Sequence, residues 1–217
     1  MPDPSAPQIG LFEALHTQRA LRRFKPDPVP DDLLWRLLDA AIRAPSGSNQ
    51  QPWGFVVVRE PERRRAIGQM LRDHVQSNDR LKALLQRSES SADPSERRML
   101  RGARVLFLEL EHAPVLIIPC LYQVTSPRPD GLLAGSSIYP AVQNLLLAAR
   151  GLGLGTVLTT FHAMFEQPLR TLLDLPPDAQ PAALIPLGFP LGKFGPTNRR
   201  PVETVVHWER WGAQRAR

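Results

Sequence analysis

The stretch Ala44-Pro45-Ser46-Gly47-Ser48-Asn49-Gln50-Gln51-Pro52-Trp53 joins a helical pattern to an apolar strand pattern. Residues 33–44 predict an amphipathic helix with four apolar residues on one face: Leu34, Leu38, Ala41 and Ile42. After the stretch, Phe55–Val58 predicts a buried strand. The connection is longer than a simple reversal of the chain requires, so we expect a ligand-binding loop.

The side chains of this loop are mostly small or carry amides. Five of them supply hydrogen-bond donors and acceptors without formal charge: Ser46, Ser48, Asn49, Gln50 and Gln51. Such groups suit the edge of a heteroaromatic ring that alternates N–H and C=O groups. The same composition is also typical of a polar surface loop in which Asn and Ser cap the backbone.

A second segment, Thr17–Phe24, contains three arginines: Arg19, Arg22 and Arg23. The helical pattern before it has three apolar residues that we expect to face inward: Leu11, Phe12 and Leu15. Guanidinium groups bind phosphate oxygens bidentately, so the arginines indicate a phosphate clamp. The alternative is chance clustering, because arginine is abundant among the 27 basic residues of the chain.

Together, these segments resemble the nitroreductase family of FMN-dependent reductases. The family's N-terminal half has an Arg-Arg-Ser motif, a Pro-Val-Pro segment, an amphipathic helix and an Ala-Pro-Ser loop that ends in Gln-Pro-Trp, and this chain has similar elements in that order. Four later segments resemble the family's central helix, core strands and C-terminal basic motif: Ala141–Gly155, Thr156–Phe161, Ile185–Pro190 and Arg199–Pro201. The resemblance covers residues 11–58 and 132–205.

The resemblance implies an α+β fold in which a mainly antiparallel sheet is covered by helices. It also implies an intertwined homodimer with the flavin at the subunit interface. Length and composition agree with one domain over residues 1–217, because 217 residues that are 42% hydrophobic can bury one substantial core. Residues 60–112 match no part of the family pattern, and we expect a helical lid there that sets acceptor choice, with a loop tip at Ser88–Ser95.

Carried over by position, the resemblance implies three groups of FMN-binding residues. Those expected at the phosphate and ribityl end are Gln18, Arg19, Ala20, Arg22 and Arg199. Those expected along the ring, in part from the partner subunit, are Pro45, Ser46, Asn49 and Gln51. The strand-end residues expected near flavin N5 are Leu158, Thr159 and Thr160. Because Gln18-Arg19-Ala20 replaces the usual Arg-Arg-Ser, Arg22 or Arg23 has to compensate, and the sequence does not choose between them.

The activity that the resemblance implies is ping-pong hydride transfer from NAD(P)H through FMN to a small-molecule acceptor such as a nitroaromatic or a quinone. No side chain is expected to be an indispensable acid or base. The main alternative class is a non-enzymatic flavin-binding protein of the same fold. Two specialised relatives are also weighed. The dehalogenases of halotyrosines use a lid tyrosine, which residues 60–112 lack, whereas nothing decides for or against the enzyme that makes the lower ligand of cobalamin.

Several other features limit the remaining classes. A net charge of +6 raises nucleic-acid binding, but only 6% of residues are aromatic and no base-stacking motif is present. The histidines and the single cysteine, Cys120, show no metal-ligand spacing, and we expect Cys120 to be buried. Gly151–Gly155 follows a helix, so we interpret it as a helix end rather than a dinucleotide motif.

The two ends of the chain carry further expectations. Neither a signal pattern nor an apolar run long enough to span a bilayer is present, so we expect a cytoplasmic protein without a membrane partner. The C-terminal segment Val202–Trp211 contains two valines and two tryptophans that a single chain would bury with difficulty: Val205, Val206, Trp208 and Trp211. We expect this segment to form part of the dimer interface.

Overall fold

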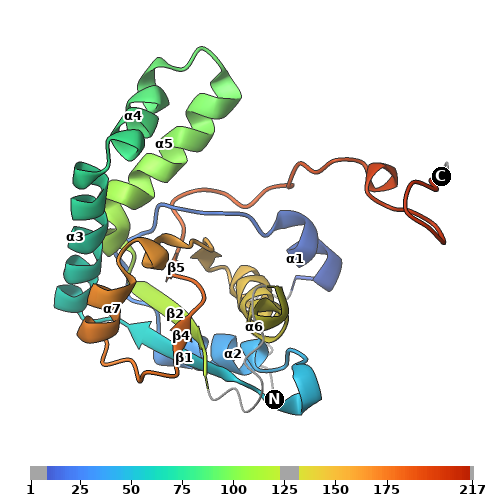
Figure 1. Ribbon diagram of the computed structural model, residues 1–217, viewed down its shortest axis with the longest axis horizontal. Coiled ribbons are helices and arrows are strands. Elements are labelled where there is room, and N and C mark those ends of the chain that lie inside the picture. The colour runs from blue at the N-terminus through green and yellow to red at the C-terminus, as the bar shows by residue number, and fades with distance from the viewer. Residues whose placement is uncertain (1–8, 123–131, 216–217) are drawn as a thin grey trace.

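The computed structural model describes residues 9–122 and 132–215 (Figure 1). An antiparallel sheet forms its centre, in the order β1 (Trp53–Val58), β2 (Val115–Leu121), β5 (Ile185–Gly188) and β3 (Gly155–Thr156), with β4 (Gln180–Pro181) paired to β2. The chain therefore has the predicted α+β fold.

The central strand β2 is apolar and buried at every position, so the middle of the sheet is covered on both faces. Alternate residues point to opposite faces of a strand, so Val115 and Ile117 pack with α2 (Asp31–Ala41) and α6 (Leu132–Gly151). Leu116 and Ile118 pack on the other face, in the apolar cluster that includes residues of α3 (Pro61–Ser77), α5 (Pro94–Glu109) and α7 (Glu166–Leu172). Cys120 lies in the second cluster and is 2% exposed, as predicted.

The central helix α6 ends where the glycine-rich segment begins. Gly153 has a φ of +74°, a conformation that favours glycine, and the Leu154 N–H donates to the Ala149 carbonyl at 2.8 Å. The segment is thus a helix C-terminus followed by β3, and the interpretation from the sequence is confirmed.

Helix α1 (Leu11–Thr17) corrects one prediction. Leu11, Phe12 and Leu15 do not face inward: they are 66%, 74% and 44% exposed, while Ala14 is the buried residue of the helix. A helix of seven residues that packs through one alanine cannot bury the rest of its apolar surface within this chain. An ion pair between Glu13 and Arg150 of α6 holds it in place.

Helix α2 and strand β1 correct two more. The buried face of α2 is formed by Leu34, Leu37 and Ala41, whereas Ile42, just after the helix, is 42% exposed and Leu38 is only partly buried. Strand β1 is not fully buried either, because it is the edge strand of the sheet. Val58 is its one buried residue, and the other five are partly exposed.

The segment from residue 60 to 112 consists of α3, α4 (Asp79–Ser90), α5 and the short 3₁₀ helix η2 (Leu110–His112). Helix α3 belongs to the core through Ile67, Leu71 and Val75, so it is not part of a mobile cover. The antiparallel pair α4 and α5 projects beyond the body (Figure 1). We call this pair the α4–α5 hairpin, and its turn, residues 91–93, is shorter than the loop tip expected from the sequence.

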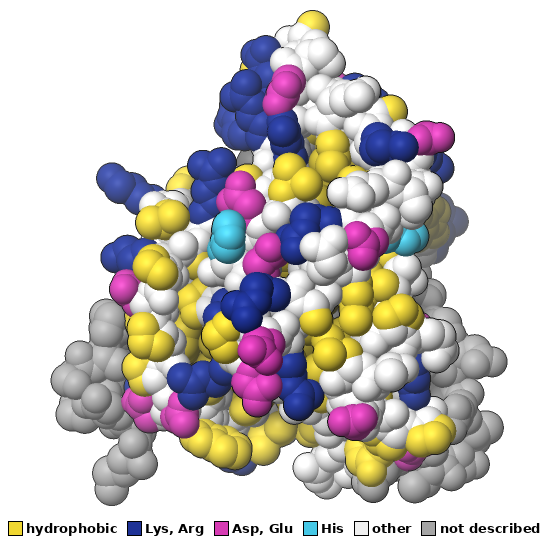
Figure 2. Space-filling view, turned by 90° about the vertical axis from the view of Figure 1, so that its left-hand side faces the viewer, with side chains coloured by type: hydrophobic (Ala, Val, Ile, Leu, Met, Phe, Trp, Pro, Cys, Tyr) yellow, Lys and Arg dark blue, Asp and Glu magenta, His cyan; other side chains and the backbone are white. Residues whose placement is uncertain are grey.

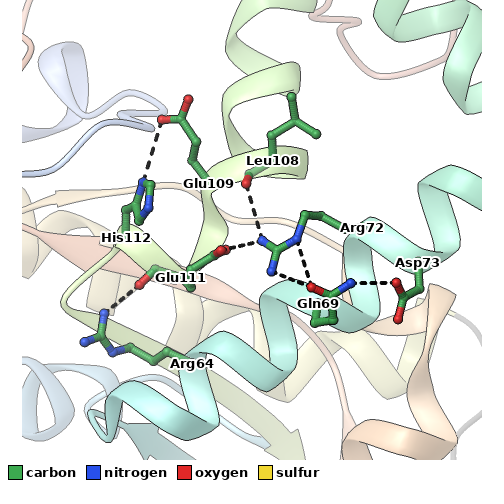
Figure 3. Close-up of polar contacts among 8 residues, drawn as sticks. All are labelled: Arg64, Gln69, Arg72, Asp73, Leu108, Glu109, Glu111 and His112. Atoms are coloured by element: carbon green, nitrogen blue, oxygen red, sulfur yellow. Dashed lines mark hydrogen bonds and ion pairs between the residues drawn. The ribbon is translucent and has the colours of Figure 1, made fainter.

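Polar contacts fix the base of this segment (Figure 3). Arg64 of α3 donates to the carbonyls of Glu111 and Ala113, both at 2.6 Å, and Arg72 pairs with the Glu111 carboxylate. The second carboxylate oxygen of Glu111 is buried and has no hydrogen-bond partner in the part of the chain that the structure describes. Figure 2 shows this side of the molecule, where positive and negative side chains alternate rather than forming one basic band.

After β5 the chain runs past α1 and away from the body to the C-terminus (Figure 1). We call residues 197–215 the C-terminal arm. It begins at Thr197, whose N–H donates to the His16 carbonyl at 2.9 Å, and contains the short 3₁₀ helix η4 (Val202–Thr204). Val202 and Trp211 are 52% and 89% exposed, so the arm does not fold back over its own chain. No helix in the described part of the chain is both long and apolar enough to cross a membrane.

Candidate functional site

The arginine-containing segment lies along the edge of the sheet formed by β3 and β5. Ala20 forms a bridge with Thr156, and the Leu21 N–H donates to the Thr156 carbonyl at 3.0 Å. Further along, the Lys25 N–H donates to the Phe189 carbonyl at 2.7 Å. These contacts hold the backbone on both sides of Arg22. They are backbone contacts, so they do not fix the Arg22 side chain.

Two glycines allow this close approach. A Cβ atom on Gly155 would lie 3.2 Å from the Leu21 Cβ, and a Cβ on Gly188 would lie 3.1 Å from the Phe24 Cβ. Gly155 and Gly188 are direct register partners in the sheet. A side chain at either position would push the arginine segment away from the strands.

Arg22 is the unusual residue of this segment. Its guanidinium is half-buried, and its Nε atom is buried with no hydrogen-bond partner among the described residues. Burial lowers the pKa of Arg22 and the nearby charge of Arg19 lowers it further. Two neighbouring cations, one of them poorly solvated and without an acid, favour binding of an anion. Arg23, by contrast, is exposed.

The strand-end residues lie next along the same edge. Thr159 is buried, exchanges backbone hydrogen bonds with Leu184, and donates its hydroxyl to the Leu184 carbonyl at 2.7 Å. Its neighbours Leu158 and Thr160 are both exposed. Thr159 therefore fixes the backbone, while its neighbours present their groups to the surface.

The loop at residues 45–51 has an unusual backbone. It contains the 3₁₀ turn η1 (Gly47–Asn49), and three of its non-glycine residues have positive φ: Ser48, Asn49 and Gln51. Such conformations cost on the order of 1 kcal/mol each and are found most often at functional sites. The Ser46 hydroxyl accepts from the Gln51 N–H at 2.9 Å, and the Ser137 hydroxyl of α6 accepts from the Gly47 N–H at 3.3 Å. The loop is thus preorganised, with its amides exposed.

A family model for the nitroreductase family matches residues 15–189, which include both the arginine segment and this loop. The chain belongs to the nitroreductase family.

Individual members of the family match almost the whole chain. An NADH dehydrogenase of Thermus thermophilus is 30% identical over 95% of this chain and 99% of its own length. A 5,6-dimethylbenzimidazole synthase of Rhodospirillum rubrum is 31% identical over 94% of this chain and 96% of its own length. Among solved structures, an FMN and NADPH-dependent nitroreductase from Sphigopyxis sp. strain HMH has a TM-score of 0.72 at 21% identity, covering 94% of this chain and 100% of that one. The family relationship supports the general activity of a flavin-dependent oxidoreductase. The relatives are named for different reactions.

The structure brings together only part of the predicted site. The segment Gln18–Arg22 and the strand end Leu158–Thr160 lie along one sheet edge, and Arg19 lies beside Gly195 at the approach to the C-terminal arm. Arg199 is exposed and donates to the carbonyl of Asn198. Within the described residues, no hydrogen bond or ion pair joins the loop at 45–51 to either group.

The sequence analysis missed two residues that position the site. Gly102 of α5 lies against Arg22, since a Cβ there would be 3.1 Å from the Arg22 Nη1 atom. Phe107 of α5 stacks on Phe161, directly after Thr160, at a ring distance of 4.5 Å. An isolated glycine inside a helical, arginine-rich pattern was the available signal for the first contact; the second had none.

Proposed function

We propose that this protein is an FMN-dependent oxidoreductase that transfers hydride from NAD(P)H to nitroaromatic, quinone or related electrophilic acceptors. The observation that carries the proposal is the unpaired, half-buried Arg22 beside Arg19, on a segment clamped to the sheet by two glycines. An anionic phosphate at this position would neutralise both cations and accept the orphaned Nε–H. The residues present therefore fit the phosphate-bearing cofactor.

Each part of the site has a separate task in this proposal. Arg19, Arg22 and Arg199 hold the phosphate and ribityl end, with Gln18 and Ala20 supplying backbone groups. The preorganised loop from Pro45 to Gln51 binds the ring edge through uncharged amides and hydroxyls. Thr159 holds the strand end so that Leu158 and Thr160 can face the ring. When bound, FMN would accept hydride from NAD(P)H and pass it to the acceptor in alternate, ping-pong half-reactions.

The proposal includes a homodimer, since one chain leaves the ring loop and the arginines unconnected. Exposed apolar surface supports it: the outer face of α1, the C-terminal arm and a groove of about 670 Å³ between α2 and β1. We call this the α2–β1 groove. Its lining includes four large apolar side chains: Trp35, Ile42, Trp53 and Phe55. Surfaces of this kind usually mark an interface between chains.

Truncation tests the dimer. Removing residues from Val202 onward should release monomers in light scattering and reduce flavin content in the same sample. A stable, FMN-loaded dimer after truncation would refute the role of the arm, and an FMN-loaded monomer would refute a site shared between chains. The cytoplasmic location expected from the sequence stays a prediction.

Flavin binding tests the function directly. The purified protein should be yellow and release FMN on acid denaturation, and Arg19→Ala and Arg199→Ala should each weaken FMN binding about ten- to hundredfold, as expected for a charge-assisted contact of about 1.5–3 kcal/mol. Arg23→Ala is the matched control, because this arginine is exposed and contributes little. A colourless protein that takes up no FMN would overturn the proposal, and equal losses in all three variants would indicate diffuse charge rather than a clamp.

Anaerobic mixing of the FMN-loaded protein with NADH or NADPH separates an enzyme from a flavin-sequestering protein. Bleaching of the oxidised flavin band followed by recovery on addition of a quinone supports the enzyme. A flavin that stays oxidised with both donors supports the sequestering protein instead.

A further inference from the structure

Helix α5 contacts the candidate FMN site at Arg22 and packs against the residue that follows the strand end. Gly102 lies against the Arg22 side chain, with a built Cβ 3.3 Å from its Cδ and 3.4 Å from its Cζ. Five residues later, Phe107 stacks on Phe161, next to Thr160. Five residues of helix span about 7.5 Å, so α5 passes close both to Arg22 and to the residue that follows Thr160. The α4–α5 hairpin is its continuation beyond the body (Figure 1).

The helix face that meets Arg22 continues toward the hairpin tip with two exposed residues. Arg98 lies four residues before Gly102 and Met99 lies three before it, so both share the face of Gly102. Arg98 is exposed and Met99 is 58% exposed. The strip from Arg22 through Gly102 to Arg98 therefore combines cations with an apolar, adaptable side chain.

Arg98 is one of four hairpin arginines that pair with no described acid, together with Arg80, Arg97 and Arg101. Among these four, Arg98 is the one that lies one helical turn before Gly102, on the same face of α5. Arg87 pairs with Glu96, and Arg104 pairs with Glu89. Arg98 forms neither a hydrogen bond nor an ion pair with any residue that the structure describes. Its charge is thus available to a ligand, whereas those of Arg87 and Arg104 are already neutralised within the hairpin.

We propose that Arg98 is a specificity residue that binds an anionic group on the small molecule that approaches the flavin, with Met99 packing against that molecule's apolar part. This inference rests on the proposed function, because Arg19 and Arg22 are then occupied by the cofactor's own phosphate. The group recognised is a carboxylate, sulfonate or phosphate. It can belong to an aromatic acceptor or be the additional phosphate that distinguishes NADPH from NADH.

The test compares ligands that differ by one charge. FMN-loaded wild type and Arg98→Gln are titrated with 4-nitrobenzoate and 4-nitrobenzyl alcohol, and separately with NADP⁺ and NAD⁺, while the absorbance of the oxidised flavin is followed. Arg80→Gln is the matched control, since Arg80 is an exposed arginine of α4 with no described partner. FMN affinity is measured first for all three proteins and should be the same.

We expect Arg98→Gln to weaken the anionic member of one pair about tenfold, as for loss of one charge-assisted hydrogen bond, and to leave the neutral or less charged member unchanged. A loss confined to nitrobenzoate assigns the anion to the acceptor, and a loss confined to NADP⁺ assigns it to the donor. The Arg80 variant should match wild type in both pairs.

Three results would overturn the inference: equal changes for charged and uncharged ligands, no change in either pair, or no binding of either anionic ligand by wild type. None of these touches the proposed function, which fails separately if wild type binds no FMN. The steady-state KM for the preferred anionic substrate should rise with salt in wild type and much less in Arg98→Gln, because screening acts on a charge that the variant lacks.

Discussion

Gly188→Ala is the sharpest single test of how the fold positions the site. Gly188 is buried in β5, and a Cβ there would lie 2.7 Å from the Cδ and 3.0 Å from the Cγ of Pro114, as well as 3.1 Å from the Phe24 Cβ. Ordinary van der Waals contact begins at 3.4 Å. The proline ring has no rotamer that moves it aside, so β2, β5 or the arginine segment has to shift by roughly 0.7 Å at a densely packed position.

The magnitude follows from two opposing terms. Adding a methyl group to a well-packed core costs about 1–3 kcal/mol. Replacing glycine by alanine restricts the unfolded chain and returns about 0.4–1 kcal/mol. The free energy of unfolding should therefore fall by about 1–2 kcal/mol, which for a chain of this length corresponds to a decrease in Tm of about 2–8 °C.

Urea denaturation of the FMN-free protein, at one protein concentration throughout, measures the change. Gly151→Ala is the matched control: its added Cβ would meet nothing within 4 Å, and it is the last residue of α6, so stability should stay the same or rise. FMN affinity should fall in the Gly188 variant, because a shift of Phe24 would displace the backbone of the arginine segment to which it belongs. If both variants show the same midpoint and the same FMN affinity as wild type, the glycine cradle does not position the site.

Three further predictions concern buried polar groups. Burial lowers the pKa of His162, against the raising effects of Glu166 and the Pro181 carbonyl. The unfolded chain therefore takes up a proton below about pH 6.5 that the folded chain does not, so the free energy of unfolding should fall as the pH decreases from 7 to 5. Urea melts at each pH should show a smaller fall for His162→Asn. Burial raises the pKa of Cys120 to about 11, which leaves on the order of one thiol in a thousand ionised at pH 8. Iodoacetamide should therefore label the single cysteine only after unfolding, as followed by mass spectrometry. Rapid labelling of the native protein would contradict the burial of Cys120. Arg72→Leu should cost about 1–3 kcal/mol of unfolding free energy, because it leaves the partly buried Glu111 carboxylate unpaired, and Arg72→Leu with Glu111→Leu should recover part of that loss; a double variant less stable than the single one would argue against this explanation.

Local sequence signals predicted the features that depend on neighbouring residues. The glycine-rich exit from α6 was recognised because it follows a helical pattern and precedes a strand pattern, and Gly153 at positive φ confirms the helix end. The burial of Cys120 followed from an unbroken apolar run in β2. Both properties are fixed within one element, so no knowledge of the tertiary arrangement was needed.

The segment from residue 60 to 112 shows how average composition can mislead. Its many charges favoured a mobile cover, yet Ile67, Leu71 and Val75 recur at a spacing of four and form a buried stripe on α3. The periodicity was present in the sequence but was outweighed by the overall polarity. The contact between Gly102 and Arg22, which joins residues 80 positions apart, depends on tertiary packing that no local pattern encodes.

The remaining errors concern apolar residues at the surface of the single chain. Leu11, Phe12 and Leu15 were expected to face inward and are exposed. The α2 and β1 patterns also placed Leu38, Ile42, Phe55 and Val57 on buried faces, whereas these residues line the α2–β1 groove. An apolar edge strand with unpaired backbone groups invites aggregation unless another segment covers it. Hydrophobic patterning reports the burial that a residue has in the working protein, whether its own chain or a second copy supplies the cover. Burial predicted from the sequence and absent from a single chain is therefore the expected sign of an interface. Its occurrence on α1 and in the α2–β1 groove, together with the exposed apolar residues of the C-terminal arm, supports the proposed site completed by two chains.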